Sequence, residues 1–228
     1  MATLYIVATP IGNLEDITKR ALRILTEVDL ILCEDTRQTQ KLLSHYEIKT
    51  PALSYHQHSK LNKVEYILDF LRQGKNLALV SDAGTPGISD PGNKLIEQLV
   101  NCPIEQLKIV PVPGPSAVTT ASGISGFPME RFLFMGFPPM KKKRNKFFEE
   151  VSSSRYPVIF YESPYRIIKT LKELSSYLSG RSDLKIVVCR ELTKKFETIY
   201  RGKIEEVLEK IEKDGVRGEF AVIVKAMK

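Results

Sequence analysis

Acidic and basic side chains follow an apolar run at residues 30–33, in the segment 34–37 (EDTR). Glu34 or Asp35 could accept a proton from a poor nucleophile such as a hydroxyl group. Arg37 could hold a phosphate through two parallel hydrogen bonds. The same cluster could instead be an ion pair that supports a site from outside, so the spacing leaves both interpretations open.

A second group with catalytic potential lies in the segment 190–197 (RELTKKFE), which contains Lys194 and Glu197. Burial can lower the pKa of a lysine, and a charged lysine can stabilise a developing alkoxide. A pair exposed at the surface is the alternative interpretation.

Histidine and aromatic side chains add candidates for nucleic-acid contact. His56 and His58 have i,i+2 spacing, which suits RNA contact or a base role for one of them; no third ligand supports a metal, so we predict no metal site. In the segment 162–166 (ESPYR), Tyr165 could stack on a base and Arg166 could pair with a phosphate. A structural role for both is the alternative.

The charge distribution favours an anionic partner, with nucleic acid first. The 228 residues contain 34 Lys+Arg against 27 Asp+Glu, a net charge of +7. Five positive charges occupy six positions at 141–146, among them Lys141, Lys142, Lys143 and Arg144. This stretch is either a solvated loop or helix start, or a patch that faces phosphates.

Three loops rich in glycine and proline follow predicted strands: 9–14 (TPIGNL), 81–92 (SDAGTPGISDPG) and 111–121 (PVPGPSAVTTA). The glycines at 87 and 92 have Walker A spacing, but Asn93 and Lys94 follow them, and no G-x-G-x-x-G motif occurs. Ser116 could cap a helix whose small residues leave room for a flat ligand. A tight turn or close helix packing could explain each loop alone, but three loops at one sheet edge favour a small-molecule site.

The elements that position these loops alternate along the chain. Short apolar runs predict strands at 4–8, 30–33, 77–80, 109–112, 132–135, 158–161, 186–189 and 220–224. Apolar residues spaced by three and four predict helices that cover 17–28, 64–71, 168–178 and 204–211. We therefore predict an α/β protein with a largely parallel or mixed sheet.

The turn-forming segment 122–128 (SGISGFP) predicts two α/β domains, 1–121 and 122–228. The cysteines at 33, 102 and 189 are far apart, so neither a disulfide framework nor a C-x-x-C site is expected. No run of about 20 apolar residues and no secretory signal occurs, so we expect a cytoplasmic protein.

Seven segments together resemble the tetrapyrrole methylase family: TPIGNL, CEDTR, SDAGTPGISDPG, PGPSAV, FYESPYR, RELTKKFET and GEFAVIV. The resemblance implies a homodimer of two-domain subunits of the class III methyltransferase fold, with S-adenosylmethionine in a cleft between the domains. TPIGNL and SDAGTPGISDPG are similar to a branch that methylates the ribose 2′-oxygen of a cytidine in small-subunit (16S) ribosomal RNA.

The resemblance also assigns roles by position. It implies cofactor contacts from the first-domain loops and from two second-domain positions, namely Pro10, Asp82, Ala83, Gly84, Gly87, Ile88, Ser116, Ala117, Glu162 and Leu192. Methyl transfer to a hydroxyl needs alignment and a proton acceptor, for which Glu34, Asp35 and Lys194 are the candidates. Arg37, the two histidines, the 141–144 stretch, Tyr165 and Arg166 are the expected RNA contacts.

Other functions remain open at this point. The same fold could methylate a tetrapyrrole or a residue of a translation factor, or it could serve as a ribosome-assembly factor without catalysis. Relatives often continue past GEFAVIV with a helical extension, whereas this sequence ends at Lys228. We therefore expect RNA contacts to come from other parts of the chain.

Overall fold

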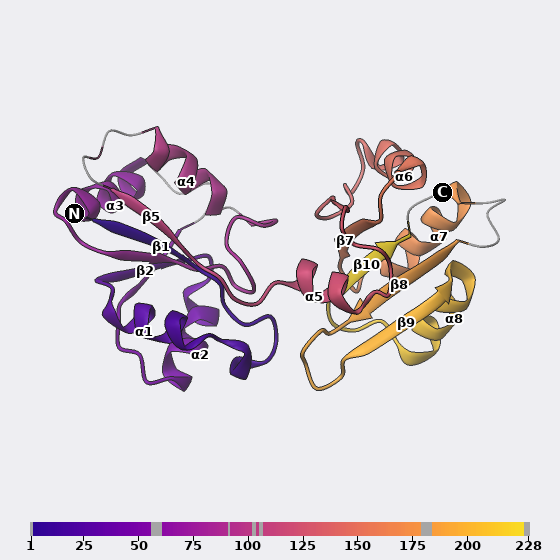
Figure 1. Ribbon diagram of the computed structural model, residues 1–228, viewed down its shortest axis with the longest axis horizontal. Helices are drawn as coiled ribbons and strands as arrows, with labels where there is room; N and C mark the ends of the chain where they lie inside the picture. The colour runs from indigo at the N-terminus through magenta and orange to yellow at the C-terminus, as the bar shows by residue number, and fades with distance from the viewer. Residues whose placement is uncertain are drawn as a thin grey trace. The chain divides into compact units, whose positions relative to one another are not determined.

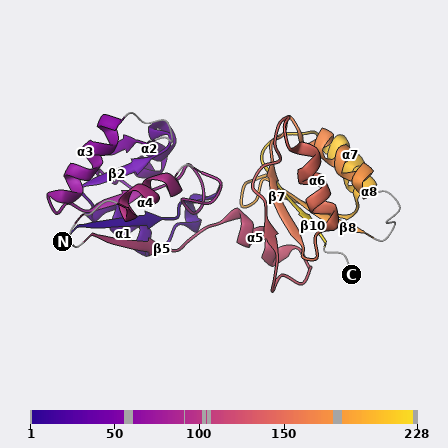
Figure 2. The same cartoon turned by 90° about the horizontal axis from the view of Figure 1, so that it is seen from above.

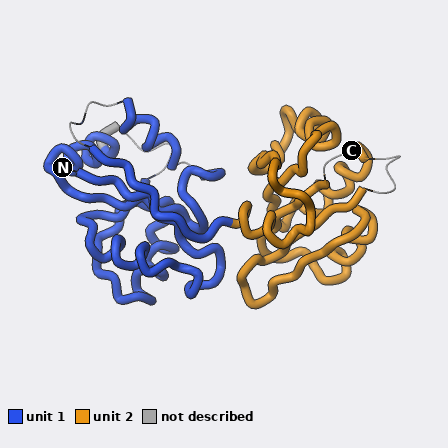
Figure 3. Tube along the Cα trace, in the orientation of Figure 1, with its two compact units in different colours: residues 1–116 blue, residues 117–228 orange. Residues whose placement is uncertain are grey.

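The computed structural model describes residues 2–55, 61–90, 92–101, 104, 107–178 and 184–225, with only the backbone at 61 and 62 (Figures 1 and 2). The chain divides into two compact units, Met1–Ser116 and Ala117–Lys228 (Figure 3). The boundary predicted after Ala121 falls inside helix α5, Ala117–Ile124. Each unit has its own five-stranded sheet.

The sheet of the first unit is entirely parallel, in the order β3-β2-β4-β1-β5. Its strands are β1 (Thr3–Val7), β2 (Leu30–Cys33), β3 (Ala52–Ser54), β4 (Leu77–Leu79) and β5 (Lys108–Val112). The runs LILC and LAL of β2 and β4 are buried throughout, as expected of parallel strands covered on both faces. All five carboxyl ends therefore lie at one edge.

Helices cover both faces of this sheet. Figure 1 shows α1 (Lys19–Glu27) and α2 (Thr36–His45) on one side, with α3 (Leu61–Arg72) and α4 (Gly92–Val100) on the other. Alternation along β2 supplies both cores: Ile31 joins the cluster with α1 and α2, whereas Leu30 and Leu32 join the cluster with α3 and α4. A short 3₁₀ turn at Leu14–Asp16 precedes α1.

The sheet of the second unit is mixed, in the order β6-β7-β10-β8-β9. Only the pair of β6 (Leu133–Phe134) and β7 (Val158–Glu162) is parallel; β8 (Lys185–Arg190), β9 (Thr198–Lys203) and β10 (Phe220–Val224) pair antiparallel. Helices α6 (Arg144–Ser153), α7 (Ile167–Tyr177) and α8 (Ile204–Asp214) share one apolar core with this sheet, and α5 lies on its other face (Figure 2).

The predicted α/β class with a parallel or mixed sheet is confirmed, and eight of the ten strands were expected from apolar runs. The runs missed β3, which has three half-buried residues, and β9, an edge strand whose sequence TIYRGK is largely polar. Cys33 and Cys189 are buried free thiols. Among the described residues, no helix is both long and apolar enough to cross a membrane.

Candidate functional site at the carboxyl edge of the first sheet

The loops that follow β1 and β4 are joined by reciprocal backbone hydrogen bonds. The Thr9 amide donates to the Gly84 carbonyl at 2.9 Å, and the Gly84 amide donates to the Thr9 carbonyl at 3.0 Å. The Thr9 hydroxyl also donates to the Ser81 carbonyl at 3.1 Å, and the Ser81 hydroxyl donates to the Gly84 carbonyl at 3.1 Å. These buried bonds fix the two loops as one piece.

The loop after β5 approaches the same piece through glycine. Gly84 has φ +84°, and a Cβ atom there would lie 3.4 Å from Ile11 Cγ2 and 3.8 Å from the Pro115 carbonyl oxygen. The Thr85 hydroxyl donates to that carbonyl at 3.2 Å. A Cβ atom on Gly114 would come within 3.1 Å of Ala8 Cβ, so this approach requires glycine. The three glycine- and proline-rich loops therefore meet.

The loop after β2 brings two carboxylates to the same edge. The Asp35 amide donates to Asp82 Oδ1 at 3.0 Å, and the Asp82 amide donates to Glu34 Oε1 at 3.4 Å. Asp35 also caps α2, because its Oδ1 accepts from the Arg37 amide at 2.8 Å. The exposed Arg37 guanidinium lies 2.6 Å from Asp35 Oδ2, so Asp35 has structural partners on two sides.

The environment of Glu34 favours its protonated form. Burial raises the pKa of Glu34, and the charges of Asp82 and Asp90 raise it further, against the opposing hydrogen bond from the Asp82 amide. A carboxylate of raised pKa is a stronger proton acceptor. Glu34 is therefore better suited than Asp35 to act as a general base.

Asp90 stabilises the long loop that leads to α4. Its carboxylate accepts from the Gly87 amide at 2.8 and 2.9 Å and from the Gly92 amide at 2.7 Å. The side chain of Ile88 is 45% exposed, and Gly87 adopts φ +89°. Asp90 was not among the residues predicted from the sequence, although a bend of this kind often uses an aspartate that caps nearby amides.

The cofactor candidates of the first unit lie on this stretch of loops, and Ala117 is the first residue of the second unit. Asp82, Ala83 and Ile88 are exposed, and Gly84 is buried beneath them. Pro10 and Ser116 are half-buried, and Ala117 begins α5. Small residues and accessible backbone groups thus occur together at the edge where the loops meet.

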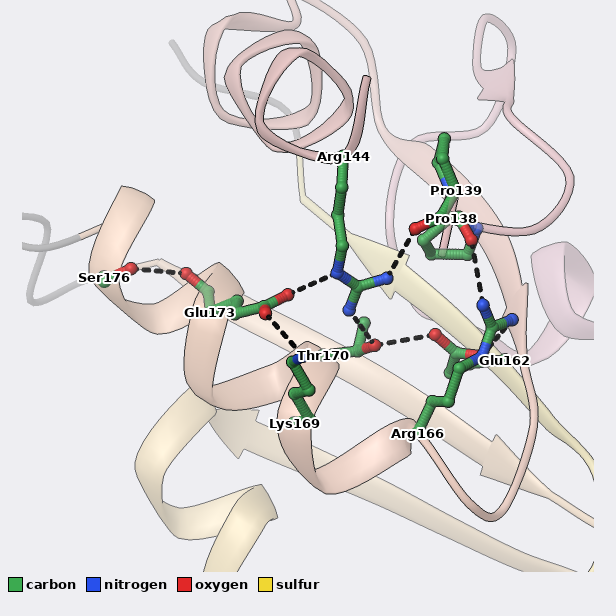
Figure 4. A network of polar contacts seen from close by, with 9 residues as sticks. All are labelled: Pro138, Pro139, Arg144, Glu162, Arg166, Lys169, Thr170, Glu173 and Ser176. Atoms are coloured by element: carbon green, nitrogen blue, oxygen red, sulfur yellow. Dashed lines mark hydrogen bonds and ion pairs between the residues drawn. The ribbon is translucent and has the colours of Figure 1, made fainter. Parts of the chain in front are cut away.

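Glu162, a second-unit candidate, ends β7 with a fully buried side chain. Its Oε1 lies 2.7 Å from Arg166 Nη2, and its Oε2 accepts from the Thr170 hydroxyl at 2.6 Å (Figure 4). The Ser163 amide also donates to Oε1 at 2.7 Å. The carboxylate is fully engaged, so any ligand contact of Glu162 must use its backbone.

Arg144 differs from the three lysines that precede it. Its Nε donates to Glu173 Oε2 at 2.6 Å, and its Nη2 donates to the Thr170 hydroxyl at 2.7 Å (Figure 4). The side chain of Arg144 is only 9% exposed. The RNA contact predicted for Arg144 is therefore not compatible with its position, because its guanidinium is committed within the unit.

Lys194 lies in the turn between β8 and β9. Its Nζ is 2.8 Å from Glu191 Oε1 and 2.9 Å from Glu219 Oε2. Burial alone would lower the pKa of Lys194, but the hydrogen bonds and charges of the two glutamates outweigh burial and raise it. Lys194 is thus a firmly protonated ammonium group, which argues against a role as proton acceptor and leaves charge stabilisation open.

The same turn holds a feature that the sequence did not reveal. Thr193 has φ +65° and Glu191 has φ +53°, a left-handed conformation that is unusual for residues other than glycine. The Thr193 hydroxyl oxygen is buried without a hydrogen-bond partner among the described residues. Leu192 between them is buried, and the Thr193 amide donates to Glu197 Oε2 at 2.6 Å. Conformational strain of this kind often marks functional turns.

The remaining candidates are the two histidines, Tyr165 and Arg166. His56 and His58 lie outside the described residues. Tyr165 is 96% exposed, whereas the neighbouring Arg166 is engaged with Glu162. The described part of the chain contains no group of three or more His, Cys, Asp or Glu side chains placed to hold a metal ion.

Comparison with known proteins identifies the family. A protein of Halalkalibacterium halodurans named "Ribosomal RNA small subunit methyltransferase I" is 46% identical over 223 residues, which cover 97% of this chain and 75% of that protein. A Thermotoga maritima protein of the same name is 44% identical over 224 residues, 98% of each chain.

Solved structures share the fold at low identity. Diphthine synthase matches with a TM-score of 0.73 and 14% identity over 99% of this chain and 90% of its own. Cobalt precorrin-4 methyltransferase matches with a TM-score of 0.69 and 20% identity over 98% of this chain and 94% of its own. The family profile described as "Tetrapyrrole (Corrin/Porphyrin) Methylases" matches residues 3–208. The chain belongs to the tetrapyrrole methylase family.

Proposed function

We propose that this protein transfers a methyl group from S-adenosylmethionine to the 2′-oxygen of a cytidine ribose in small-subunit (16S) ribosomal RNA. The observation that carries this proposal is the identity of 44 to 46% with proteins named for methylation of small-subunit ribosomal RNA, over nearly the whole chain. The loops at the carboxyl edge of the first sheet support it with a suitable chemical environment.

The loop residues fit S-adenosylmethionine, which supplies a methyl group on a positively charged sulfur. The exposed carboxylate of Asp82 suits a cationic ligand, and its direction is fixed by the amide of Asp35. Among the described residues, a Cβ atom on Gly87 would meet only the Asn93 amide nitrogen, at 3.9 Å, so a ligand can approach that backbone closely. The residues proposed to hold the cofactor are Pro10, Asp82, Ala83, Gly84, Gly87, Ile88, Ser116, Ala117, Leu192 and the backbone of Glu162.

Glu34 is the proposed proton acceptor. Its pKa is raised by burial and by two neighbouring carboxylates. It can therefore take the proton of the ribose 2′-hydroxyl that would accept the methyl group. Asp35 positions Asp82 and begins α2. Lys194 stays charged, and its proposed contribution is electrostatic.

The assembly state and location are part of this proposal. We expect a homodimer, on the basis of the family resemblance, and a cytoplasmic protein, because its proposed substrate is part of the ribosome. Arg37 and Tyr165 are exposed and suited to contact RNA. Diphthine synthase and precorrin methyltransferases share the fold at 20% identity or less, so their likeness does not favour their substrates for this chain.

The decisive experiment supplies labelled S-adenosylmethionine and small ribosomal subunits that lack the modification, and then maps the labelled nucleotide with nucleases. Label on one ribose 2′-oxygen would support enzyme, cofactor and substrate together. If the cofactor binds and no RNA is labelled, the ribosomal RNA proposal fails, and a tetrapyrrole, a translation-factor residue or a role without catalysis must be tested in its place.

A further inference from the structure

The segment between β6 and α6 carries five exposed residues, and we call it the basic ledge: Phe137, Met140, Lys141, Lys142 and Lys143. Phe137 is 50% exposed, Met140 is 77% exposed, and the three lysines are exposed. None of the three lysines forms an ion pair with the acidic residues that the structure describes. Two large apolar side chains therefore lie next to three uncompensated positive charges.

Two arginines form hydrogen bonds with backbone carbonyl groups at the start of the ledge. Arg166 Nη1 donates to the Pro138 carbonyl at 3.1 Å, and Arg144 Nη1 donates to the Pro139 carbonyl at 3.0 Å (Figure 4). The Phe137 ring also packs edge-on against Tyr161, with ring centroids 5.5 Å apart. Three consecutive residues at the start of the ledge are thus fixed to the folded unit.

Both arginines are in turn fixed by the buried side chains of Glu162 and Thr170 and by the half-buried Glu173. Arg166 pairs with Glu162, the Thr170 hydroxyl joins Glu162 to Arg144, and Arg144 pairs with Glu173 (Figure 4). A buried arginine with its hydrogen bonds satisfied in this way has little freedom to move. The network therefore holds the ledge backbone in one conformation.

Rigidity distinguishes this ledge from an ordinary lysine-rich loop. A solvated lysine loop has no need for proline carbonyls that are anchored by the buried guanidinium group of Arg144 and the half-buried one of Arg166. Fixing the backbone in advance reduces the entropy lost on binding. Large apolar side chains that are exposed to water raise the free energy of the unbound protein, and they are typical of a surface that binds a partner.

We propose that the basic ledge binds an unpaired stretch of RNA, in which Lys141, Lys142 and Lys143 neutralise phosphates while Phe137 and Met140 contact the faces of unstacked bases. Base faces are accessible in single strands and hidden in a duplex, so the apolar side chains favour an unpaired segment. Arg144 and Arg166 are positioning residues that do not touch the RNA. This inference rests on the proposed ribosomal RNA substrate.

The first test measures binding of a fluorescent, unstructured RNA oligonucleotide of about 20 nucleotides by anisotropy over a series of salt concentrations. Lys141→Glu with Lys142→Glu should weaken binding at least tenfold at low salt and make the salt slope shallower by about 0.7 per lost phosphate contact. Lys210→Glu with Lys213→Glu, on exposed positions of α8, makes the same charge change away from the ledge and is the matched control. Equal losses in the two double variants would overturn the proposal.

The two apolar side chains of the ledge should affect RNA affinity without affecting its salt dependence. Phe137→Ser with Met140→Ser should weaken binding of the single strand about tenfold without changing the salt slope, because stacking is lost and charge is not. The same oligonucleotide annealed to its complement should bind more weakly to the wild type and be insensitive to this double change. A duplex that binds as tightly as the single strand contradicts the role of the two apolar side chains.

The positioning role of the two arginines is tested with variants that free the ledge backbone and leave its net charge unchanged. Pro139→Gly frees the ledge backbone and leaves the arginine network in place, so affinity should fall about threefold with an unchanged salt slope, while the greater freedom of the unfolded chain lowers stability by about 0.4–1 kcal/mol. Arg144→Lys keeps the charge and removes the bonds to Thr170 and Pro139; it should show the same unchanged slope together with a lower affinity. A steeper or shallower slope in either variant would mean that the arginine or the loop contacts phosphate directly.

Methylation of small ribosomal subunits separates this inference from the proposed function. If the wild type methylates ribosomal RNA and the ledge variants bind and methylate normally, the ledge inference is wrong and the function stands. If the wild type never methylates ribosomal RNA but the ledge binds single strands as described, the function fails and the ledge stands. If the ledge variants bind RNA normally and lose activity only on assembled subunits, the ledge contacts a ribosomal protein. That result would overturn the proposed RNA contact.

Discussion

At Glu34, burial and the neighbouring charges act in the same direction on one carboxyl group. Its pKa is raised, so the base form is gained only as pH rises through that higher pKa. Glu34→Gln should lower the rate of methyl transfer about a hundredfold or more and leave cofactor affinity unchanged. Single-turnover rates measured against pH should lose their acidic limb in this variant.

The same substitution, which lowers the rate of methyl transfer, should raise the stability of the folded protein. A carboxyl whose pKa is higher in the folded state binds its proton more tightly there, so ionisation above that pKa costs folding free energy. Glu34→Gln should therefore raise the melting temperature at pH 8 and have little effect at pH 4. Asp35→Asn keeps an N-cap and should retain most of the rate; a larger loss in Asp35→Asn than in Glu34→Gln would move the base to Asp35.

The hydroxyl of Thr193, which has no hydrogen-bond partner in the described parts of the chain, leads to a second prediction. Valine has the same shape and no polar atom, so Thr193→Val should stabilise the ligand-free protein by about 1 kcal/mol in urea unfolding. Thr193→Ser keeps a hydroxyl and removes a branch that is strained at φ +65°. A destabilised valine variant would show that the hydroxyl has a partner in solution.

The roles of some single residues could not be predicted from the sequence. Lys141, Lys142, Lys143 and Arg144 form one run in the sequence, yet only Arg144 turns inward to meet Glu173. Its partner is 29 positions further along the chain, and charge patterns report no contact at that separation. Lys194 likewise forms an ion pair with Glu219, which lies in the connection between α8 and β10. Roles that depend on spacing were predictable, and roles that depend on distant partners were not.

At the scale of elements, the loops after β1 and β4 depend on the left-handed backbone of Gly84. Gly84→Ala should destabilise the protein by about 1–2 kcal/mol and weaken cofactor binding, because an alanine is strained at φ +84° and relief of that strain would shift the bridge to Thr9. Calorimetry of S-adenosylmethionine binding and urea unfolding measure the two effects.

Gly74 provides the matched control for this change. It has φ +78°, close to the +84° of Gly84, but no atom lies within 4 Å of an added Cβ. Gly74→Ala should therefore cost a similar strain energy and leave cofactor affinity unchanged. Equal affinity losses in both variants would mean that the effect comes from general destabilisation.

Periodicity predicted most elements because burial follows a regular pattern within them. The continuous apolar runs of β2 and β4 and the spaced apolar residues of α7 and α8 are examples. By contrast, β9 pairs with β8 through its backbone while Arg201 and Lys203 remain exposed. Hydrogen bonds between backbones leave little trace in residue type, so an edge strand of this kind is hard to detect.

At the scale of the whole molecule, the apolar cores of the two units share no residue. One cluster belongs to the second unit and includes Leu171, and two clusters belong to the first. Leu171→Ala should cost about 2–5 kcal/mol. Hydrogen exchange should accelerate in β7, β8 and β10, while the amides of β1 and β4 keep their protection; acceleration in both units alike would show that they unfold together.

The chain passes from the first unit to the second only once, at Ser116 and Ala117. The residues just before this point belong to the loop whose Pro115 carbonyl accepts the hydroxyl of Thr85. Recombining halves from different family members would therefore place the joint inside a loop that is proposed to bind the cofactor. The two units cannot be treated as exchangeable parts in protein engineering, and a chimaera of this fold must carry residues 113–117 together with the loop after β4 from the same parent.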